Sequence, residues 1–502
     1  MTNYLYKYIF KENENSDSIF LINEEQEVSY KNFSNLINQI SNLLLLNNLK
    51  PNDRVAVKAP KSIIQLALYF ATIKCGGIYL PLNTDYTAQE LKYFLEDSDA
   101  SFLIIDPNNL DELSNLLDVS SLKIFTLDQN GNGSLNSQYH SLPITFNEIL
   151  RNKNDLAAIL YTSGTTGKSK GAKLTHENLV SNTLVLKDYW QFKKNDVLLH
   201  MLPIYHTHGL FVACNLLSMV GGKMIFLKKF DVEDTIKWLK YSSTMMGVPT
   251  FYSRLIQSEK LTKDVTKNIR LFISGSAPLL PETHKIFEEK TGHVILERYG
   301  MTETNMSISN PYDGKRIAGT VGKPLPGIEM RIVDPKTNKS VKKGEIGIIE
   351  LKGKNVFEGY WNMPEKDKES FKQDGFFITG DMAKIDKNDY VIIVGRDKDL
   401  IISGGLNIYP KEIEEIINDI DGIEETAIVG VPHSDFGEAV IAIIKKTKNN
   451  VDENFIFDYL QNKLAKFKKP KKIIFVHELP RNTMGKVQKA NLREKYKTIF
   501  KN

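Results

Sequence analysis

The sequence predicts an α/β fold, with a large N-terminal domain of stacked mixed and parallel sheets covered by helices, a β-rich subdomain, and a small α+β C-terminal domain. Two observations predict this fold. Strand-like apolar runs alternate with helical periods over about the first 400 residues, and short β runs then precede a separate compact unit. The 502 residues allow about three domain-sized units, and the content of 41% hydrophobic and 25% charged residues is typical of a folded globular protein.

The alternation of strands and helices is clear in two parts of the N-terminal domain. Residues 53–60 form a strand pattern that a helical pattern at 62–77 follows, and residues 269–278 form another that precedes a helix at 281–292. Gly292 is placed to end that helix as its C-cap. Such βα repetition is typical of largely parallel sheets with helices on their faces.

The pattern changes in the C-terminal third of the chain. Residues 328–396 contain short β runs with tight turns, which predict the β-rich subdomain of a large domain spanning residues 1–396. Residues 397–502 predict the small domain, because about one hundred residues suffice for an independent fold. Its expected elements are a helix at 409–419, strands at 426–431 and 439–446, a helix at 453–464 and a strand at 472–479.

Composition excludes several classes of function. The net charge of +4 is too small to predict a surface that binds nucleic acid or a membrane. Cys75 and Cys214 lack CxxC partners, so we expect no disulfide and a reducing compartment. The N-terminus has no uninterrupted apolar segment of the signal-peptide kind, and the apolar window at 198–222 is broken by polar residues and a proline. We therefore expect a cytoplasmic protein whose partners are small molecules.

A glycine-rich loop at 162–171 follows the apolar run at 156–161. Its glycines let backbone N–H groups turn toward an anion, and its hydroxyls and lysines suit a polyphosphate such as that of ATP. The Walker A pattern does not fit, because Thr162 stands where that spacing requires glycine. Taken alone, the loop is equally compatible with a polar hairpin turn.

Four further motifs follow in order: ERYGMTET, ITGD, GRDKDLIISGG and PRNTMGKVQK. Together with the loop, they make the chain resemble the acyl-adenylate-forming enzymes from about residue 25 to its end, the glycine-rich loop being the phosphate element. The segments LPIYHTHGLF, MGVPTFYSRL and SGSAPLLPETH resemble malonyl-CoA synthetases in particular. The resemblance implies that ATP with Mg²⁺ activates malonate to an acyl-AMP, and that the thiol of CoA then releases AMP.

The resemblance also implies the nucleotide site. Thr302 would contact phosphate, and Glu303 would hold Mg²⁺, because a hard cation prefers oxygen ligands. Asp381 would accept the ribose hydroxyls with help from Arg396. Without the match, Glu303 would be a solvated helix acid and Tyr299 a core residue. The complete expected ATP-binding set is Thr162, Ser163, Gly164, Thr165, Thr166, Gly167, Lys168, Gly275, Ser276, Ala277, Pro278, Tyr299, Gly300, Met301, Asp381 and Arg396.

The remaining functional residues of the resemblance lie toward the C-terminus. Lys486 matches the catalytic lysine, whose ammonium would lie between the substrate carboxylate and the α-phosphate. Lys398 matches the hinge about which the mobile small domain rotates after adenylation. Ser403, Gly404 and Gly405 would then line the channel for the pantetheine of CoA, although a plain loop turn would explain the glycines too.

Three side chains in the acyl-site segments favour a dicarboxylate: His206, Arg254 and Arg298. A second buried carboxylate needs a paired cation, and arginine provides a bidentate one. Only ten residues of the chain are arginine, so two in these segments are informative. The alternatives are that Arg254 forms an ion pair on a helix surface, that Arg298 braces the sheet and that His206 is hydrogen-bonded in the core. Rival functions are a CoA ligase for another small or aromatic acid, an amino-acid adenylating domain and an inactive nucleotide-binding regulator.

Overall fold

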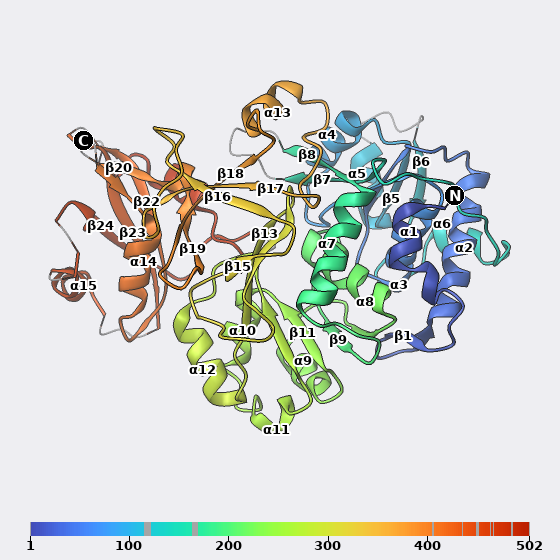
Figure 1. Ribbon diagram of the computed structural model, residues 1–502, viewed down its shortest axis with the longest axis horizontal. Helices are drawn as coiled ribbons and strands as arrows, with labels where there is room; N and C mark the ends of the chain where they lie inside the picture. The colour runs from blue at the N-terminus through green and yellow to red at the C-terminus, as the bar shows by residue number, and fades with distance from the viewer. Residues whose placement is uncertain are drawn as a thin grey trace. The chain divides into compact units, whose positions relative to one another are not determined.

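The protein is described by a computed structural model covering residues 2–114, 122–162, 169–403, 406–433, 435–447, 451–461, 463–464, 466–482 and 485–500 (Figure 1). The chain forms two compact units. The first comprises Met1–Glu329 and Leu351–Phe377, and the second comprises Met330–Glu350 and Ile378–Asn502. The expected α/β fold is confirmed.

A six-stranded sheet lies in the N-terminal part of the first unit, with the strand order β6-β5-β3-β4-β7-β8. Its strands pair in parallel except β8, which is antiparallel to β7. The strand expected at 53–60 is β3, and the helix expected at 62–77 is α3, which ends before Gly76 takes a φ of +75°. The strands are β3 (Arg54–Lys58), β4 (Ile78–Pro81), β5 (Phe102–Ile105), β6 (Lys123–Thr126), β7 (Leu156–Thr162) and β8 (Lys170–Thr175).

A nine-stranded sheet forms the rest of the first unit, in the order β15-β14-β13-β12-β11-β9-β10-β1-β2. Its central strands are parallel, whereas β2, β14 and β15 run antiparallel to their neighbours. The strands are β1 (Ile19–Ile22), β2 (Glu27–Ser29), β9 (Val197–His200), β10 (Lys223–Phe226), β11 (Thr244–Gly247), β12 (Leu271–Ser274), β13 (Leu296–Met301), β14 (Asn305–Ser309) and β15 (Lys323–Pro324).

Helices cover these sheets, as expected from the βα order. Beside β11 and β9, Figure 1 shows α9, α10 and α12, whose apolar faces join Met245 and Phe272 of the sheet in one core. Gly292 ends α12 with a φ of +77°, so the predicted C-cap is confirmed. The helices are α1 (Tyr4–Ile9), α2 (Tyr30–Leu46), α3 (Ile63–Lys74), α4 (Ala88–Ser98), α5 (Leu110–Ser114), α6 (Ser134–Tyr139), α7 (His176–Tyr189), α8 (Asn215–Val220), α9 (Val232–Leu239), α10 (Pro249–Leu255), α11 (Lys263–Thr266), α12 (Pro281–Thr291) and α13 (Pro364–Ser370).

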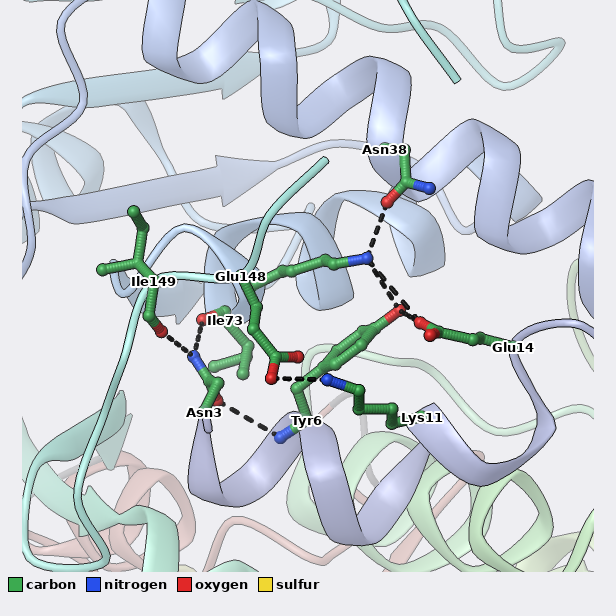
Figure 2. Close-up of polar contacts among 9 residues, drawn as sticks. Asn3, Tyr6, Lys11, Glu14, Asn38, Ile73, Glu148 and Ile149 are labelled. Atoms are coloured by element: carbon green, nitrogen blue, oxygen red, sulfur yellow. Dashed lines mark hydrogen bonds and ion pairs between the residues drawn. The ribbon is translucent and has the colours of Figure 1, made fainter. Parts of the chain in front are cut away.

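A buried lysine holds the N-terminal helix α1 to α2 and α3. Lys74 Nζ donates to Asn38 Oδ1 at 2.7 Å and to the Tyr6 hydroxyl at 3.2 Å, and it lies 3.8 Å from Glu14 Oε2. Figure 2 shows Tyr6, Glu14 and Asn38 converging on this point, and the Tyr6 hydroxyl donates to Glu14 at 3.0 Å. Burial lowers the pKa of Lys74, and the carboxylate of Glu14 opposes this shift.

The second unit combines two sheets. A four-stranded sheet has the order β16-β17-β18-β19, and a five-stranded sheet has the order β21-β20-β23-β22 with β24 paired to β23. Residues of β22 and β23 alternate between two cores, one under α14 and α15 and one under α16. The elements are β16 (Glu329–Val333), β17 (Gly347–Lys352), β18 (Phe377–Ile385), β19 (Val391–Arg396), β20 (Ile401–Ser403), β21 (Leu406–Ile408), α14 (Pro410–Asn418), β22 (Ile423–His433), β23 (Gly437–Lys446), α15 (Glu453–Leu460), β24 (Lys472–Val476) and α16 (Lys489–Tyr496).

The division into units differs from the expected boundary after residue 396. Residues 330–350 and 378–396 group with the C-terminal residues, because α14 packs on β19 and Lys411 Nζ donates to the carbonyl of Ile393 at 2.5 Å. The expected boundary marks where the small domain would rotate about Lys398. Packing within one conformation does not show such a rotation, so the boundary after residue 396 stays a prediction. The helix expected at 453–464 ends at Leu460, although Leu464 still packs in the core.

Candidate active site

The glycine-rich loop joins the two antiparallel strands β7 and β8. Thr162 pairs with Lys170 across the hairpin, and its hydroxyl donates to the Lys170 carbonyl at 3.3 Å. The hydroxyl of Tyr93, from α4, donates to the carbonyl of Ser169 at 2.8 Å, so a helix fixes one end of the loop. The other loop residues of the expected ATP-binding set lie outside the described residues: Ser163, Gly164, Thr165, Thr166, Gly167 and Lys168.

The loops after β12 and β13 form a second part of the site. These strands are parallel neighbours, so Gly275–Pro278 and the end of β13 meet at one edge of the sheet, where open α/β sheets bind ligands. Ser276 adopts a φ of +75°, which turns the chain sharply after β12. Tyr299, at the end of β13, is half-buried, and its role beside the adenine stays a prediction. Gly300 packs so closely on the Asn305 carbonyl that a Cβ would lie 2.0 Å from its oxygen.

Glu303 lies with Thr302 in the turn between β13 and β14. The interpretation of Glu303 as a solvated helix acid is therefore wrong, since its exposed fraction is 6% and it lies in no helix. Its Oε1 accepts a hydrogen bond of 3.0 Å from the hydroxyl of Tyr360. Among the described residues no group of three or more His, Cys, Asp or Glu could hold a metal. A single buried carboxylate fits Mg²⁺, which commonly takes one or two carboxylates and completes its shell with phosphates and waters.

Arg298 is a charged residue buried in the first unit. It is only 3% exposed, and its Nε and Nη2 find no hydrogen-bond acceptor among the residues described. Burial lowers its pKa to about 9. A Cβ at Gly275 would lie 2.4 Å from Arg298 Cζ, so the guanidinium rests directly on the Gly275 backbone. An anion bound beside this guanidinium would offset the cost of burying its charge.

His208 lies beside this arginine, and sequence reasoning missed it. It is buried at the start of a π-helical turn at His208–Cys214, and its Nδ1 lies 3.5 Å from the Ser276 hydroxyl. Burial, with the nearby charge of Arg298, lowers its pKa well below 6.5, so its ring is neutral. Its position two residues after His206 in the same motif was the available signal.

The three residues expected to bind the diacid differ in their burial. His206 is half-buried next to the ring of Tyr205, at 4.7 Å between centroids. Arg254 is exposed in the last turn of α10, so it lies on a helix surface, as the alternative interpretation placed it; the ion pair of that alternative stays a prediction. Arg298 alone of the three is fully buried.

Asp381 and Arg396 are brought together in the second unit. They face each other across β18 and β19, with Arg396 Nε 2.6 Å from Asp381 Oδ1. Lys398 follows in a short 3₁₀ turn at Asp397–Asp399, and burial together with the charge of Arg396 lowers its pKa. Arg493 braces the same turn through an ion pair of 2.5 Å with Asp399.

Lys486 and Ser403 are the other expected residues of the second unit. Lys486 is exposed, and its backbone exchanges hydrogen bonds of 2.9 Å with Asn482. Ser403 is buried at the end of β20, whereas Gly404 and Gly405 lie outside the described residues.

Comparison with known proteins gives the family. Residues 11–361 match the AMP-binding enzyme family, and residues 412–486 match the AMP-binding enzyme C-terminal domain. The chain is 34% identical over 477 residues to the malonate–CoA ligase of Arabidopsis thaliana, covering 88% of this chain and 78% of that protein. It is 31% identical over 493 residues to a long-chain-fatty-acid–CoA ligase of Bacillus subtilis (strain 168), covering 91% and 88%.

A solved structure agrees with these relatives. The crystal structure of ATP-bound MatB from Rhodopseudomonas palustris superposes with a TM-score of 0.97 at 51% identity and covers 100% of both chains. The resemblance drawn from five short motifs is thereby confirmed. With its glycine-rich hairpin, its buried Glu303 and its paired Asp381 and Arg396, the chain belongs to the AMP-binding enzyme family.

Proposed function

We propose that the protein is an AMP-forming ligase that joins malonate to CoA through malonyl-AMP, with release of pyrophosphate and then AMP. Relatives named malonate–CoA ligase support the assignment, at 34% identity for the plant protein and 32% for one from Bos taurus. The observation that carries the choice of acid is Arg298, a buried guanidinium with two nitrogens that lack acceptors in the described structure.

Arg298 binds the carboxylate of malonate that does not react. A guanidinium and a carboxylate form two parallel hydrogen bonds, which orient the diacid as well as neutralise it. His208, neutral and adjacent, offers a further hydrogen-bonding nitrogen, because its buried Nε2 has no partner among the described residues. Methylmalonate is a secondary substrate, and His206 and Arg254 contribute from the rim of the site.

The nucleotide is held mainly by backbone and hydroxyl groups of the first unit. Thr302 and the glycine-rich loop contact phosphates, and the residues at Gly275–Pro278 and Tyr299–Met301 flank the adenine. Glu303 holds Mg²⁺, which when bound neutralises charge on the phosphate oxygens during adenylation. Both reaction steps build negative charge, so placed cations and donors supply most of the catalysis.

The second unit supplies the ribose site, the catalytic lysine and the thiol path. Asp381, fixed by Arg396, accepts the ribose hydroxyls. Lys486 screens the repulsion between the attacking carboxylate and the α-phosphate. After adenylation the domain from residue 397 rotates at Lys398 and brings Ser403, Gly404 and Gly405 to the pantetheine of CoA. No helix among the described residues is both long and apolar enough to cross a membrane.

Pyrophosphate release in parallel assays with malonate, methylmalonate, acetate and benzoate tests the proposal. We expect malonate to react best, methylmalonate to follow, and the monocarboxylates to react poorly with or without CoA. A preference for benzoate or acetate would instead identify a ligase for another small or aromatic acid. Absence of AMP formation with every acid would contradict the ligase assignment.

A variant of Arg298 tests the acid site directly. Arg298→Ala should lower kcat/KM for malonate by about tenfold or more, which corresponds to about 1.4 kcal/mol per decade. Arg54→Ala is the control, because Arg54 bonds the Ser98 carbonyl and Asp99 at the surface of the six-stranded sheet. A variant of Arg298 that handles malonate like the parent would show that the dicarboxylate is bound elsewhere.

A further inference from the structure

The hydroxyl of Tyr360 contacts the carboxylate that is proposed to hold Mg²⁺. It donates to Glu303 Oε1 at 3.0 Å, and both residues are buried, with exposed fractions of 4% for Tyr360 and 6% for Glu303. The two residues are 57 positions apart in the chain. A carboxylate that accepts one fixed hydrogen bond loses rotational freedom and keeps its second oxygen for a cation.

The backbone around Tyr360 is hydrogen-bonded to Glu303 and to the β7–β8 hairpin, which carries the glycine-rich loop. Phe357 N donates to the carbonyl of Glu303 at 2.8 Å. On the other side, Trp361 N donates to Gly171 at 2.7 Å and Lys173 N donates to Gly359 at 3.0 Å. Residues 357–361 therefore connect Glu303 with strand β8, whose first residues, Lys170 and Gly171, end the glycine-rich loop.

The ring of Tyr360 makes a separate contact with the hairpin. The ammonium of Lys170 lies over its face, 4.5 Å from the centroid, and Lys170 is the residue paired with Thr162 at the base of the loop. The ring also packs edge-on against Phe357 at 4.9 Å, and Phe357 packs against Phe377 at 5.0 Å. The ring is thus held by packing that does not depend on the hydroxyl.

From these contacts we infer that Tyr360 is a positioning residue for adenylation. It fixes the orientation of the Glu303 carboxylate and connects this carboxylate to the β7–β8 hairpin, which carries the glycine-rich loop. The inference rests on the proposed role of Glu303 as the Mg²⁺ ligand. Because Mg²⁺ demands near-ideal octahedral geometry, a carboxylate free to rotate binds the metal–nucleotide complex more weakly. Groups that orient a metal ligand typically contribute about 10- to 100-fold to metal affinity or activity.

Tyr360→Phe separates the hydroxyl from the ring, which keeps its aromatic neighbours and the contact with Lys170. We expect ATP affinity, measured by calorimetry in Mg²⁺, to fall about tenfold, while ATP affinity in EDTA stays unchanged. The Mg²⁺ concentration for half-maximal pyrophosphate release should rise by a similar factor. A residue with a merely structural role would lower the melting temperature without shifting this metal dependence.

Two further variants make the test specific. Tyr30→Phe removes a buried hydroxyl that donates to the Gly222 carbonyl at 2.7 Å, far from Glu303 in the chain, and should leave the metal dependence of ATP binding unchanged. Glu303→Gln should remove most of the Mg²⁺ dependence, and adding Tyr360→Phe to it should have no further effect, because both act through one carboxylate.

The outcomes for Tyr360 and for the proposed function are distinguishable. If the parent releases no pyrophosphate with malonate, the proposed function fails, while the comparison of ATP binding with and without Mg²⁺ still assesses Tyr360. If Tyr360→Phe binds Mg²⁺ and ATP as tightly as the parent, or if its effect persists undiminished in Glu303→Gln, the inference is overturned.

Discussion

At the scale of single residues, Gly275 and Arg298 act as a pair. Gly275→Ala would place a Cβ 2.4 Å from Arg298 Cζ, too close for either group to keep its position. We expect the KM for malonate to rise about tenfold because the buried guanidinium must shift, at about 1.4 kcal/mol per decade. Steady-state kinetics check this, with Gly77→Ala as the control, since a Cβ there would lie 3.1 Å from Thr72 Cγ2, away from the acid site. A parent-like KM in Gly275→Ala would contradict the contact.

The pKa of Arg298 predicts, at the same scale, how the KM for malonate depends on pH. Its pKa is lowered to about 9 by burial, and a bound carboxylate would favour the charged form again. Below pH 9 the free site is already charged, whereas above it the site must take up a proton to bind malonate. The KM for malonate should therefore rise with pH, approaching about tenfold per pH unit well above the pKa. Measurement of KM from pH 7 to 10 checks this, and a KM for malonate that stays flat to pH 10 would contradict it.

At the scale of elements, helix α1 depends on the polar contacts around Lys74. Glu14→Ala removes the acceptor of the Tyr6 hydroxyl and the anion nearest Lys74, leaving buried polar groups with fewer partners. We expect the free energy of unfolding to fall by about 1–3 kcal/mol in urea titrations. Asp17→Ala, which removes only an exposed ion pair with Lys31 at 3.7 Å, should change it by less than about 0.5 kcal/mol. Equal effects in the two variants would show that the network is not stabilising.

At the scale of the whole molecule, we expect Lys486 to act in the adenylation of malonate and not in the transfer of the malonyl group to CoA. Lys486→Ala should abolish pyrophosphate release with malonate and spare the conversion of supplied malonyl-AMP and CoA into malonyl-CoA. Separate assays of the two half-reactions check this, with Lys497→Ala in the C-terminal helical region as a control. Loss of both half-reactions, or of neither, would contradict the proposed rotation of the small domain.

The sequence by itself determined the order of strands and helices, the C-cap at Gly292 and the motifs of the AMP-binding family. These features depend on neighbouring residues, because periodicity, turn chemistry and motif spacing are local. Through the resemblance to the family, the motifs also singled out Glu303, Asp381 and Arg396, whose roles in binding Mg²⁺ and ribose stay predictions.

Only the tertiary structure decided which polar side chains are buried together. Arg298 and Arg254 looked equivalent in sequence, yet the pairing of β12 with β13 buries Arg298 against Gly275, while Arg254 stays exposed on α10. Likewise, nothing local connects Tyr360 with a carboxylate 57 residues away. Burial and long-range hydrogen bonds depend on how distant segments pack, and the free energy that selects those contacts is a property of the whole fold rather than of any stretch of sequence.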